Sequence, residues 1–300
     1  MNSAVLGARR KKPTFVHVVT NILLFSFSLL CIIPLWSIIS ASFSNDNNLT
    51  LEGFRLIPKP IDLTAYRYIL NDPTLIIGSY KISILITAAG SIASLLITSG
   101  IAYVLSRPDF RYRNHLSFFV FFTMLFNGGL IPWYILISNY LHLVNTLWAL
   151  ILPMLVNAWN ILLLRTFFQK IPFEVIESCT IDGANEFTIF FRMILPLSKP
   201  GLATIGLFIV LGYWNDWWLG LLFVEKQELV PLQLLLYRMM SNITYLTTTT
   251  QIPAFLKSTR IPTQSARMVM AILAAGPMLF IFPFFQKYFV KGLTVGAVKG

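Results

Sequence analysis

The stretch FVHVVTNILLFSFSLLCIIPLWSIISASF, residues 15–43, contains no Asp, Glu, Lys or Arg. A helix needs about 20 mostly apolar residues to cross the hydrocarbon core of a bilayer, and this stretch is long enough. Windows of that length find five further apolar stretches along the chain. The six candidate spans are Phe15–Phe43, Tyr80–Ser106, His115–Leu136, Leu143–Phe168, Pro200–Phe223 and Met268–Val290. We therefore predict an all-α membrane protein with six transmembrane helices.

The composition of the whole chain agrees with this prediction. Of its 300 residues, 56% are hydrophobic and 12% are charged, whereas a soluble domain carries about twice that charged fraction. A net charge of +11 would favour nucleic-acid binding in a soluble protein, but here the basic residues lie between apolar runs. We therefore expect no nucleic-acid partner. Cys31 lies in an apolar run and Cys179 in a polar segment, so we expect neither a disulfide nor a Cys-based metal site.

The basic residues also predict the orientation in the membrane. Residues 1–14 form a basic tail, and the apolar run after it is too long for a cleaved signal peptide, so we expect a retained anchor. The loops that would share a side with this tail carry more Lys and Arg than the opposite loops. Both termini, including the tail at residues 291–300, are therefore predicted to be cytoplasmic.

Two outer segments are too long to be simple turns. Ser44–Ser79 contains several prolines and acidic residues, and we expect an ordered cap or loop there. Val224–Arg267 contains the run Thr247–Thr250, and its polar low-complexity composition favours a flexible, protruding loop.

The segment between the fourth and fifth candidate spans reads IPFEVIESCTIDGANEFTIFFRMILP, residues 171–196. Pro172 and Glu174 are typical of a helix N-terminus, and Asp182-Gly183 is a strong turn signal. One apolar face at helical spacing is formed by Phe173, Ile176 and Thr180. A second short helix should follow the turn. From the residues alone, an ordinary interfacial loop and a partner-docking element are both open.

The same segment resembles the EAA signature of the membrane subunits of ABC importers. That signature is Glu-Ala-Ala, three residues, Gly, nine residues, Ile, any residue and Leu-Pro. The matching positions are Glu177-Ser178-Cys179, Gly183, Met193 and Leu195-Pro196, with Asp182 and Ala184 on either side of the glycine as in common forms. Ser178 and Cys179 replace the two alanines and Met193 replaces the isoleucine, so two small residues and one apolar residue are kept while the residue types differ.

Further stretches are similar to the carbohydrate-uptake branch of these importers, the maltose and multiple-sugar type, and most resemble the LplC-like permeases of Gram-positive bacteria. They are Ala102–Arg107, Gly128–Pro132, Trp214–Asp216, Gln286–Gly292 and Lys299-Gly300. The resemblance covers nearly the whole chain and is weakest in the two outer segments. It implies the MetI-like permease fold, in which residues 171–196 contain a cytoplasmic coupling helix.

The resemblance also implies which tasks fall to other subunits. The chain has no Gly-x-x-x-x-Gly-Lys-Ser/Thr loop, so ATP and Mg would be used by two separate P-loop ATPase subunits, and this chain would bind no cofactor and would not be an enzyme. A second homologous permease subunit and an extracellular or periplasmic substrate-binding protein would complete the importer in the bacterial cell membrane. The residues implied in ATPase coupling are Glu174, Glu177, Ser178, Cys179, Asp182, Gly183 and Ala184.

The candidate solute path lies in the fourth and fifth spans. Asp216 is the only acidic residue well inside a predicted span, and such a carboxylate is a functional candidate by default. Aromatic rings and amide or carboxylate acceptors suit the apolar faces and hydroxyl edges of sugars. The candidates are Tyr213, Trp214, Asn215, Asp216, Asn157 and Asn160. Hydrogen bonding between helices, or a position close to the outer surface, would explain the same residues without a solute.

Two other classes of membrane protein are alternatives. A self-sufficient secondary transporter or channel should carry several intramembrane ionisable residues or an internal repeat, and the sequence shows one Asp and no repeat. A membrane enzyme would need a catalytic cluster, and none is visible. The three histidines, His17, His115 and His142, are scattered and predict no metal site.

Overall fold

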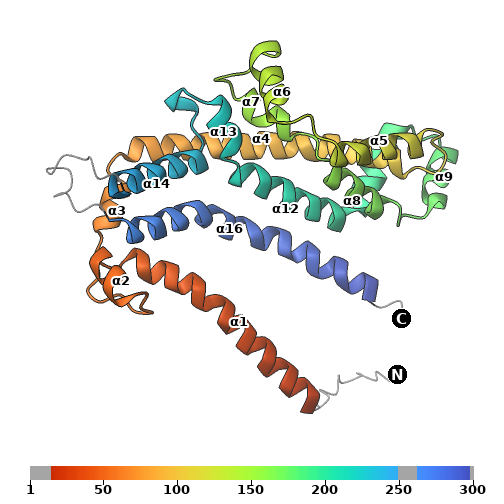
Figure 1. Cartoon of the computed structure of the whole chain (residues 1–300). Coiled ribbons are helices and arrows are strands. Elements are labelled where there is room, and N and C mark those ends of the chain that lie inside the picture. Colours follow the sequence, from red (N-terminus) through yellow and green to blue (C-terminus); the bar gives the residue numbers. More distant parts are fainter. Residues whose placement is uncertain (1–14, 249–261, 298–300) are drawn as a thin grey trace. The chain divides into compact units, whose positions relative to one another are not determined.

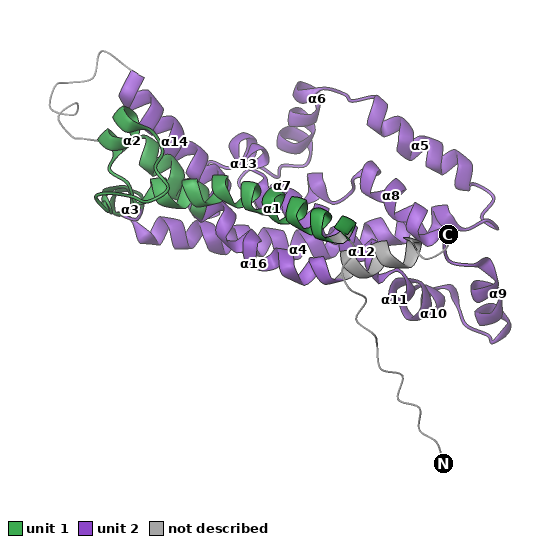
Figure 2. Ribbon diagram, turned by 90° about the horizontal axis from the view of Figure 1, so that it is seen from below, with its two compact units in different colours: residues 1–69, 255–272 green, residues 70–254, 273–300 purple. Residues whose placement is uncertain are grey.

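The computed structural model describes residues 15–248 and 262–297, and the predicted basic tail 1–14 lies outside them. Within these residues the chain is helical, with one isolated bridge between Ser44 and Ile61 and no strand (Figure 1). The chain divides into two compact units, residues 1–69 with 255–272 and residues 70–254 with 273–300 (Figure 2).

The first unit contains the long helix α1 and a small ordered cap. Its helices are α1 (Phe15–Ser42), α2 (Asp46–Glu52), α3 (Thr64–Ile69) and the first turns of α16 (Gln264–Ala297). The Asp46 carboxylate accepts hydrogen bonds from the backbone N–H groups of Gln264 and Ser265, at 2.7 and 2.9 Å. The Asp62 carboxylate accepts from the Thr64 hydroxyl and backbone and from the Asn45 amide, and these bonds lower its pKa. The prediction of an ordered cap in the first outer segment is confirmed.

The second unit contains the remaining helices. They are α4 (Pro73–Ser106), α5 (Arg113–Leu125), α6 (Leu130–Ile135), α7 (Trp148–Ile151), α8 (Ala158–Phe168), α9 (Phe173–Ile181), α10 (Glu186–Ile189), α11 (Leu195–Leu197), α12 (Lys199–Asn215), α13 (Trp218–Phe223), α14 (Leu232–Thr248) and the rest of α16. π-helical turns at Leu136–Tyr140 and Phe190–Ile194 follow α6 and α10. Helix α4 is longer than the predicted span, because Asp72 caps it and Pro73 starts it.

Helix α4 forms the core of this unit with α8 and α12. At Gly90, a Cβ atom would lie 2.6 Å from the ring of Tyr213 on α12, so the two helices approach closely because glycine has no side chain. The Tyr213 hydroxyl donates to the carbonyl oxygen of Ile151 at 2.9 Å. Small buried residues such as Ser94 and Thr98 extend the same face of α4. This is the packing expected between membrane helices, where small residues let backbones come together.

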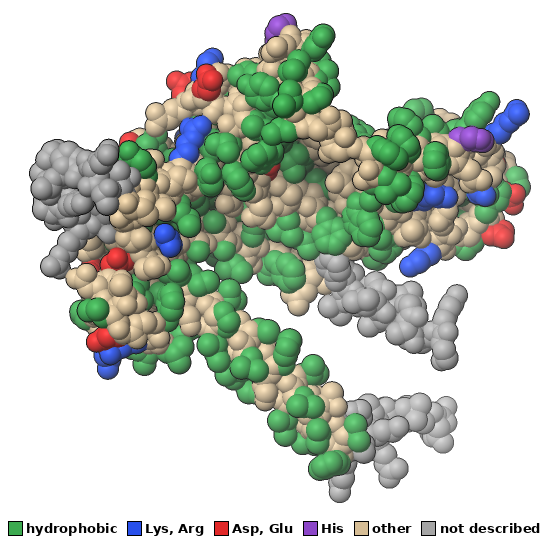
Figure 3. All heavy atoms as spheres, viewed as in Figure 1, with side chains coloured by type: hydrophobic (Ala, Val, Ile, Leu, Met, Phe, Trp, Pro, Cys, Tyr) green, Lys and Arg blue, Asp and Glu red, His purple; other side chains and the backbone are tan. Residues whose placement is uncertain are grey.

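Three helical stretches are long and apolar enough to cross a bilayer by themselves, namely Val18–Ser42, Pro73–Ser106 and Gln264–Lys287. Three bent helix pairs also meet this criterion when each pair is taken as one span, so length and composition allow three to six spans. Exposed apolar side chains cover α1 and α5, among them Leu23, Phe25, Phe118 and Phe119 (Figure 3). Helices with this surface are those of a membrane protein.

The third, fourth and fifth candidate spans are not continuous helices in the structure. The third bends by 109° between α5 and α6, where Gly129 has a positive φ and its N–H is bound by the Asn127 side chain. The fourth bends by 49°, because the 3₁₀ turn containing Pro153 ends before Asn157 caps α8. Helix α12 ends at Asn215, because Asp216 adopts an extended conformation before α13.

The expectation of a flexible loop across Val224–Arg267 was wrong for much of that segment. Residues 232–248 form the helix α14, and Leu232, Leu234 and Ile243 on it are buried. The Leu232 N–H donates to the Ser83 hydroxyl of α4 at 2.8 Å. The buried leucines at the start of α14 hold this helix against the chain. The expectation of a flexible loop rested on the Thr-rich stretch at its other end. Residues 249–261 lie outside the described part of the chain.

Candidate functional site

Segment 171–196 folds as two short helices joined at Gly183. After α9 ends, the Gly183 N–H donates to the Thr180 carbonyl at 3.0 Å and the Ala184 N–H donates to the Cys179 carbonyl at 2.9 Å. These two bonds form a Schellman motif, which requires a left-handed residue at the position of Gly183. The φ of Gly183 is +81°, and a Cβ there would meet no atom within 4 Å. The glycine is therefore needed for its backbone conformation rather than for space.

The second helix begins immediately after the turn. The Asn185 side chain caps α10 by accepting a hydrogen bond from the Thr188 N–H at 2.8 Å. The π-helical turn Phe190–Ile194 then leads through α11 to Ser198, where the chain bends by 85° into α12. Segment 171–196 is thus joined to the core helix α12 through one short helical connection.

The outer surface of this segment is acidic with two prominent apolar side chains. Glu174, Glu177 and Asp182 are exposed, as is Ser178, while Cys179 is half-buried and Ala184 partly covered. Two large apolar side chains stand on either side of the turn and are almost fully exposed: Ile181 at 85% and Phe187 at 77%. Free apolar surface of this kind, rimmed by carboxylates, is typical of a docking site.

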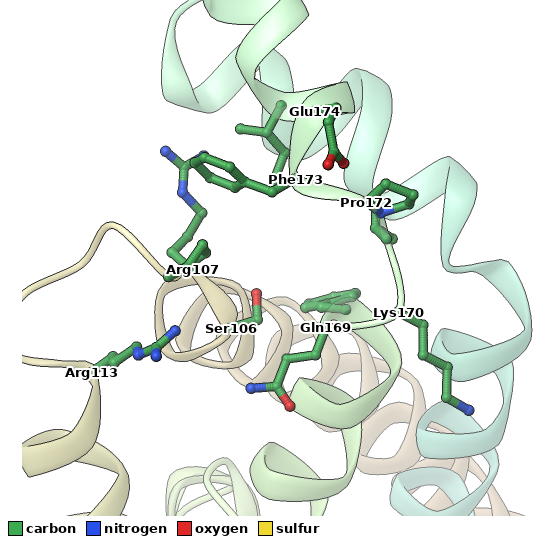
Figure 4. A pocket seen from close by; sticks show the side chains of 12 residues that line it. Ser106, Arg107, Arg113, Gln169, Lys170, Pro172, Phe173 and Glu174 are labelled. Atoms are coloured by element: carbon green, nitrogen blue, oxygen red, sulfur yellow. The ribbon is translucent and has the colours of Figure 1, made fainter.

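The apolar face expected on α9 is only partly covered by the chain itself. Ile176 is only 7% exposed, and Phe173 lies beside it on the inner side, next to the end of α4 (Figure 4). Phe173 and Ile176 therefore face the chain itself, whereas Thr180 is exposed. Ile181 and Phe187 are the most exposed large apolar side chains of the two helices.

The inner side of the segment is held by a polar cluster that we call the arginine hub, formed by Arg107, Tyr103, Asp109, Glu186 and Phe173. The Arg107 guanidinium pairs with both Asp109 oxygens at 2.8 and 2.6 Å and with Glu186 at 3.1 Å. The Tyr103 hydroxyl donates to Glu186 at 2.7 Å and accepts from Arg107 at 3.0 Å. The guanidinium also lies 5.7 Å from the centroid of the Phe173 ring.

The hub joins three elements at one buried cation. The Arg107 side chain is 11% exposed, so its charge depends on these partners. Its hydrogen bonds to Asp109 hold the pKa of that carboxyl below its usual value and raise the pKa of Arg107. Because Arg107 ends α4, Phe173 begins α9 and Glu186 begins α10, both helices of segment 171–196 are bound to the end of α4.

The sequence analysis missed this hub as a unit. Tyr103 and Arg107 stood out only as part of the stretch Ala102–Arg107, which resembles the importer family, and the pattern of residues 171–196 did not single out Glu186. Glu186 lies 79 positions from Arg107 in the chain, and no local pattern links the two. The feature of the sequence that could have indicated the hub is Arg107, a basic residue directly after a long apolar run.

The candidate path residues separate into two groups. Asn157, Asn160 and Tyr213 line one cavity of about 190 Å³ between α8 and α12, which we call the asparagine cavity. Asn157 caps α8, since its side chain accepts from the Asn160 N–H at 3.1 Å. Tyr213 contributes its ring, while its hydroxyl is bound to the Ile151 carbonyl.

The other three candidates lie outside that cavity. The Trp214 ring is 2% exposed, and its N–H donates to the Ala274 carbonyl at 2.9 Å. The Asn215 amide donates to Leu211 in its own helix at 2.9 Å. The Asp216 carboxylate accepts from the Leu219 N–H at 3.2 Å and so caps the start of α13. Each of these polar groups therefore has a bond within the chain, and the bond of Trp214 runs between two helices, α12 and α16.

The fold and the site define a class of protein: an integral membrane protein with a helix–turn–helix element whose outer surface carries exposed acidic and apolar side chains. Residues 96–295 match the family described as the inner membrane component of binding-protein-dependent transport systems. The chain belongs to this family of permease subunits, and the MetI-like fold expected from the sequence is confirmed.

Individual relatives agree over nearly the full length. The chain is 39% identical over 279 residues to the polygalacturonan/rhamnogalacturonan transport system permease protein YtcP of Bacillus subtilis, covering 92% of this chain and 96% of the relative. It is 39% identical over 286 residues to the protein LplC of the same organism, covering 95% of each. A chain from the crystal structure of a bacterial ABC transporter that imports the acidic polysaccharide alginate superimposes with a TM-score of 0.75. That chain is 31% identical, and the match covers 91% of this chain and 95% of that one.

Proposed function

We propose that this chain is a permease subunit through which an ATP-driven importer takes up an oligosaccharide. Membership of the binding-protein-dependent family supports an importer over a self-sufficient secondary transporter or channel. The names of the relatives support the solute class, since they include pectic polysaccharide and alginate uptake systems. Arabinooligosaccharide permeases at 30% identity widen that class to neutral saccharides.

The observation that carries this proposal is the exposed surface of segment 171–196. Ile181 and Phe187 can enter an apolar groove of an ATPase subunit, and the carboxylates of Glu174, Glu177 and Asp182 can pair with a basic rim. Gly183 sets the angle between the two helices. The small side chains of Ser178, Cys179 and Ala184 leave room around the turn for the partner. ATP and Mg belong to the two ATPase subunits in this scheme.

The arginine hub provides a route from the docked segment to the spans. A movement of α9 and α10 has to carry the end of α4 with it, because Phe173 and Glu186 are both bound to Arg107. The same movement reaches α12 through the π-helical turn Phe190–Ile194. Alternating access can then follow from a joint displacement of α4 and α12, which pack along each other.

The solute path in this scheme runs past the asparagine cavity. Asn157 and Asn160 offer amide groups, and Tyr213 offers a ring, which together suit a sugar. Trp214, Asn215 and Asp216 support the path by fixing the junction of α12 and α13. A second permease subunit would complete the cavity, and an extracellular or periplasmic binding protein would deliver the solute. Both termini of the chain would lie in the cytoplasm.

The test is ATPase retention by a double variant, Ile181→Asp with Phe187→Asp, in the complete importer. We expect the ATPase subunits to be lost on purification, because two charges would enter the apolar groove. The matched control is Leu51→Asp, since Leu51 is 83% exposed but lies in the other unit. Full ATPase retention by the double variant would contradict the docking role of this surface.

A second measurement separates the importer from its rival. The purified chain alone, reconstituted in vesicles without nucleotide, should carry no solute, whereas a secondary transporter would carry it. The complete importer supplied with ATP and its binding protein should accumulate an oligosaccharide from a panel of acidic and neutral saccharides.

A further inference from the structure

Three exposed aromatic rings meet where α13 lies beside α14 (Figure 1). The Trp217 and Tyr237 rings stack, with centroids 4.5 Å apart and an angle of 19° between their planes. The Trp218 ring meets the Trp217 ring edge-on, at 5.7 Å and 84°. The rings therefore form one aromatic surface to which both segments contribute, and two of the ring planes are almost at right angles.

Two amide side chains lie beside these rings. Gln233 is four residues before Tyr237, so both lie on the same face of α14. Asn215 is two residues before Trp217, and its side-chain oxygen accepts a hydrogen bond from the Gln233 amide at 3.5 Å. The amide pair and the ring pair thus connect the same two segments. We call the five residues the aromatic platform: Asn215, Trp217, Trp218, Gln233 and Tyr237.

The amides of the platform keep hydrogen-bonding capacity for a ligand. A primary amide has two N–H donors and an oxygen that can accept two hydrogen bonds. Asn215, which is exposed, uses one donor for the Leu211 carbonyl and one acceptor position for Gln233. Gln233 uses one donor in that contact. Flat rings next to such amides suit a ligand with apolar faces and hydroxyl edges, which is the chemistry of a sugar.

Aromatic residues also gather at membrane surfaces, where they anchor helices without any ligand. An anchoring belt requires rings at the right depth, but it requires neither a stacked pair nor an amide pair between two helices. In the platform both pairs are present, and each ring contacts another ring. This arrangement favours a binding surface.

The charged residues next to the platform in the chain are already bonded. Asp216 caps α13, and the Arg238 guanidinium donates to the Val224 carbonyl at 2.9 Å. The five side chains of the platform are themselves neutral. Such a surface recognises the apolar face and the hydroxyl groups of a sugar rather than a charge on it.

The platform continues a face of α12 that already lines the candidate path. Phe208 and Gly212 line the asparagine cavity. Asn215 follows them at spacings of four and three residues, so the three positions share one side of the helix. At 1.5 Å per residue, Asn215 lies about 10 Å from Phe208 along the helix axis. An extended chain of several sugar units can therefore contact the cavity and the platform together.

We propose that the aromatic platform is a second saccharide subsite, which holds one sugar unit of an oligosaccharide by its apolar face while another unit occupies the asparagine cavity. This inference rests on the proposed function, the uptake of an oligosaccharide. Segment 171–196 precedes the opposite end of α12, so the platform lies on the side of the cavity away from the proposed ATPase contact. The stacked rings hold each other in place before the sugar arrives, which lowers the ordering cost of binding.

The test measures saccharide binding by saturation-transfer NMR on the complete importer, purified without its binding protein. The probes are the di- and tetrasaccharides of arabinose, which are neutral, and of galacturonic acid, which are acidic. We expect the wild type to bind a tetrasaccharide about fivefold more tightly than the matching disaccharide, and Trp217→Leu to remove most of this difference. Trp217→Phe keeps a flat ring and should keep part of it. The matched control is Trp148→Leu, since Trp148 is exposed in the same unit but lies outside the platform.

Three outcomes would overturn the platform: equal binding of both lengths by the wild type, an unchanged difference in Trp217→Leu, or the same loss in Trp148→Leu. If Trp217→Leu does not assemble, Tyr237→Leu removes the other stacked ring, and an unchanged difference there has the same meaning. ATP-driven uptake is measured on the same importer after the binding protein is added. A wild type that takes up saccharides without a length dependence of binding overturns the platform alone, whereas one that neither binds nor takes up any of them overturns the proposed function as well.

Discussion

Segment 171–196 and the junction of α12 with α13 both contain acidic and aromatic residues, but they use them in opposite ways. In the segment, Glu174 and Asp182 are exposed and Phe187 stands free of the chain. At the junction, Trp214 is buried and Asp216 caps the next helix. The polar groups named in the first region remain exposed to another molecule, whereas those of the second region form hydrogen bonds within the fold. A carboxylate therefore marks a binding surface only when its hydrogen bonds are not already made.

The largest expected effect tests the turn of the segment. Gly183→Asp places a side chain at a φ of +81°, which costs about 1–2 kcal/mol and opposes the Schellman turn. We expect uptake by the complete importer to fall by more than about tenfold while the subunit still inserts, because a changed turn would misplace Ile181 and Phe187. Gly183→Asn is the comparison, since asparagine tolerates the left-handed region better, and it should keep more uptake. Equal uptake by wild type and Gly183→Asp would show that the turn does not matter for coupling.

The next effect tests the inner side of the same segment. Arg107→Gln removes the cation that holds Glu186 and Asp109, and charged hydrogen bonds of this kind contribute about 1.5–3 kcal/mol. We expect uptake to fall about tenfold while ATP hydrolysis falls less, so that more ATP is used for each solute imported. Tyr103→Phe, which loses one neutral donor to Glu186, should have a smaller effect in the same direction. An unchanged ratio of ATP to solute in Arg107→Gln would reduce the hub to a structural role.

A third effect tests how tightly the interior is packed near the junction. Gly90→Ala puts a Cβ 2.6 Å from the Tyr213 ring, and such overpacking costs about 1–3 kcal/mol. The thermal unfolding temperature of the purified subunit should drop. Gly100→Ala on the same helix meets no atom within 4 Å and should leave stability unchanged or slightly raised. A higher unfolding temperature for Gly90→Ala would mean that the α4–α12 contact is looser than described.

The smallest effect separates the two tasks of Asn157. Asn157→Ser keeps a good helix cap but removes the amide from the asparagine cavity. Stability should therefore be kept, while the KM of uptake should rise about fivefold through loss of about one neutral hydrogen bond to the solute. Asn157→Ala should lose both the helix cap and the amide, so stability should fall and the KM of uptake should rise. If the serine variant transports with a normal KM, the cavity does not belong to the path.

Local signals in the sequence predicted the elements whose causes are local. Pro172 and Gly183 set the start and end of α9, because a proline start and a left-handed glycine act within one helical turn. The long apolar runs predicted α1, α4 and α16 for the same reason. The candidate residues of segment 171–196 were found by resemblance, and most of them are exposed.

Features that depend on distant partners were beyond the sequence. Hydropathy windows could not show the bend after α5, since they average over the short interruption at Asn127 and Gly129 with apolar residues on both sides of it. The pairing of Arg107 with Glu186 requires the fold to bring α4 and α10 together. The burial of Ile176 toward its own chain could not be distinguished from burial toward a partner, because both need the same apolar spacing.

Helix α4 has 34 residues without an internal proline, which corresponds to about 51 Å of continuous helix against about 30 Å of hydrocarbon. The helix therefore extends beyond the hydrocarbon core, and its end at Arg107 lies in the polar region. If the Arg107 end of this stiff helix is held, a small change in its tilt displaces the opposite end by a larger distance. A rotation of about 5° over that length moves the Asp72 end by about 4 Å.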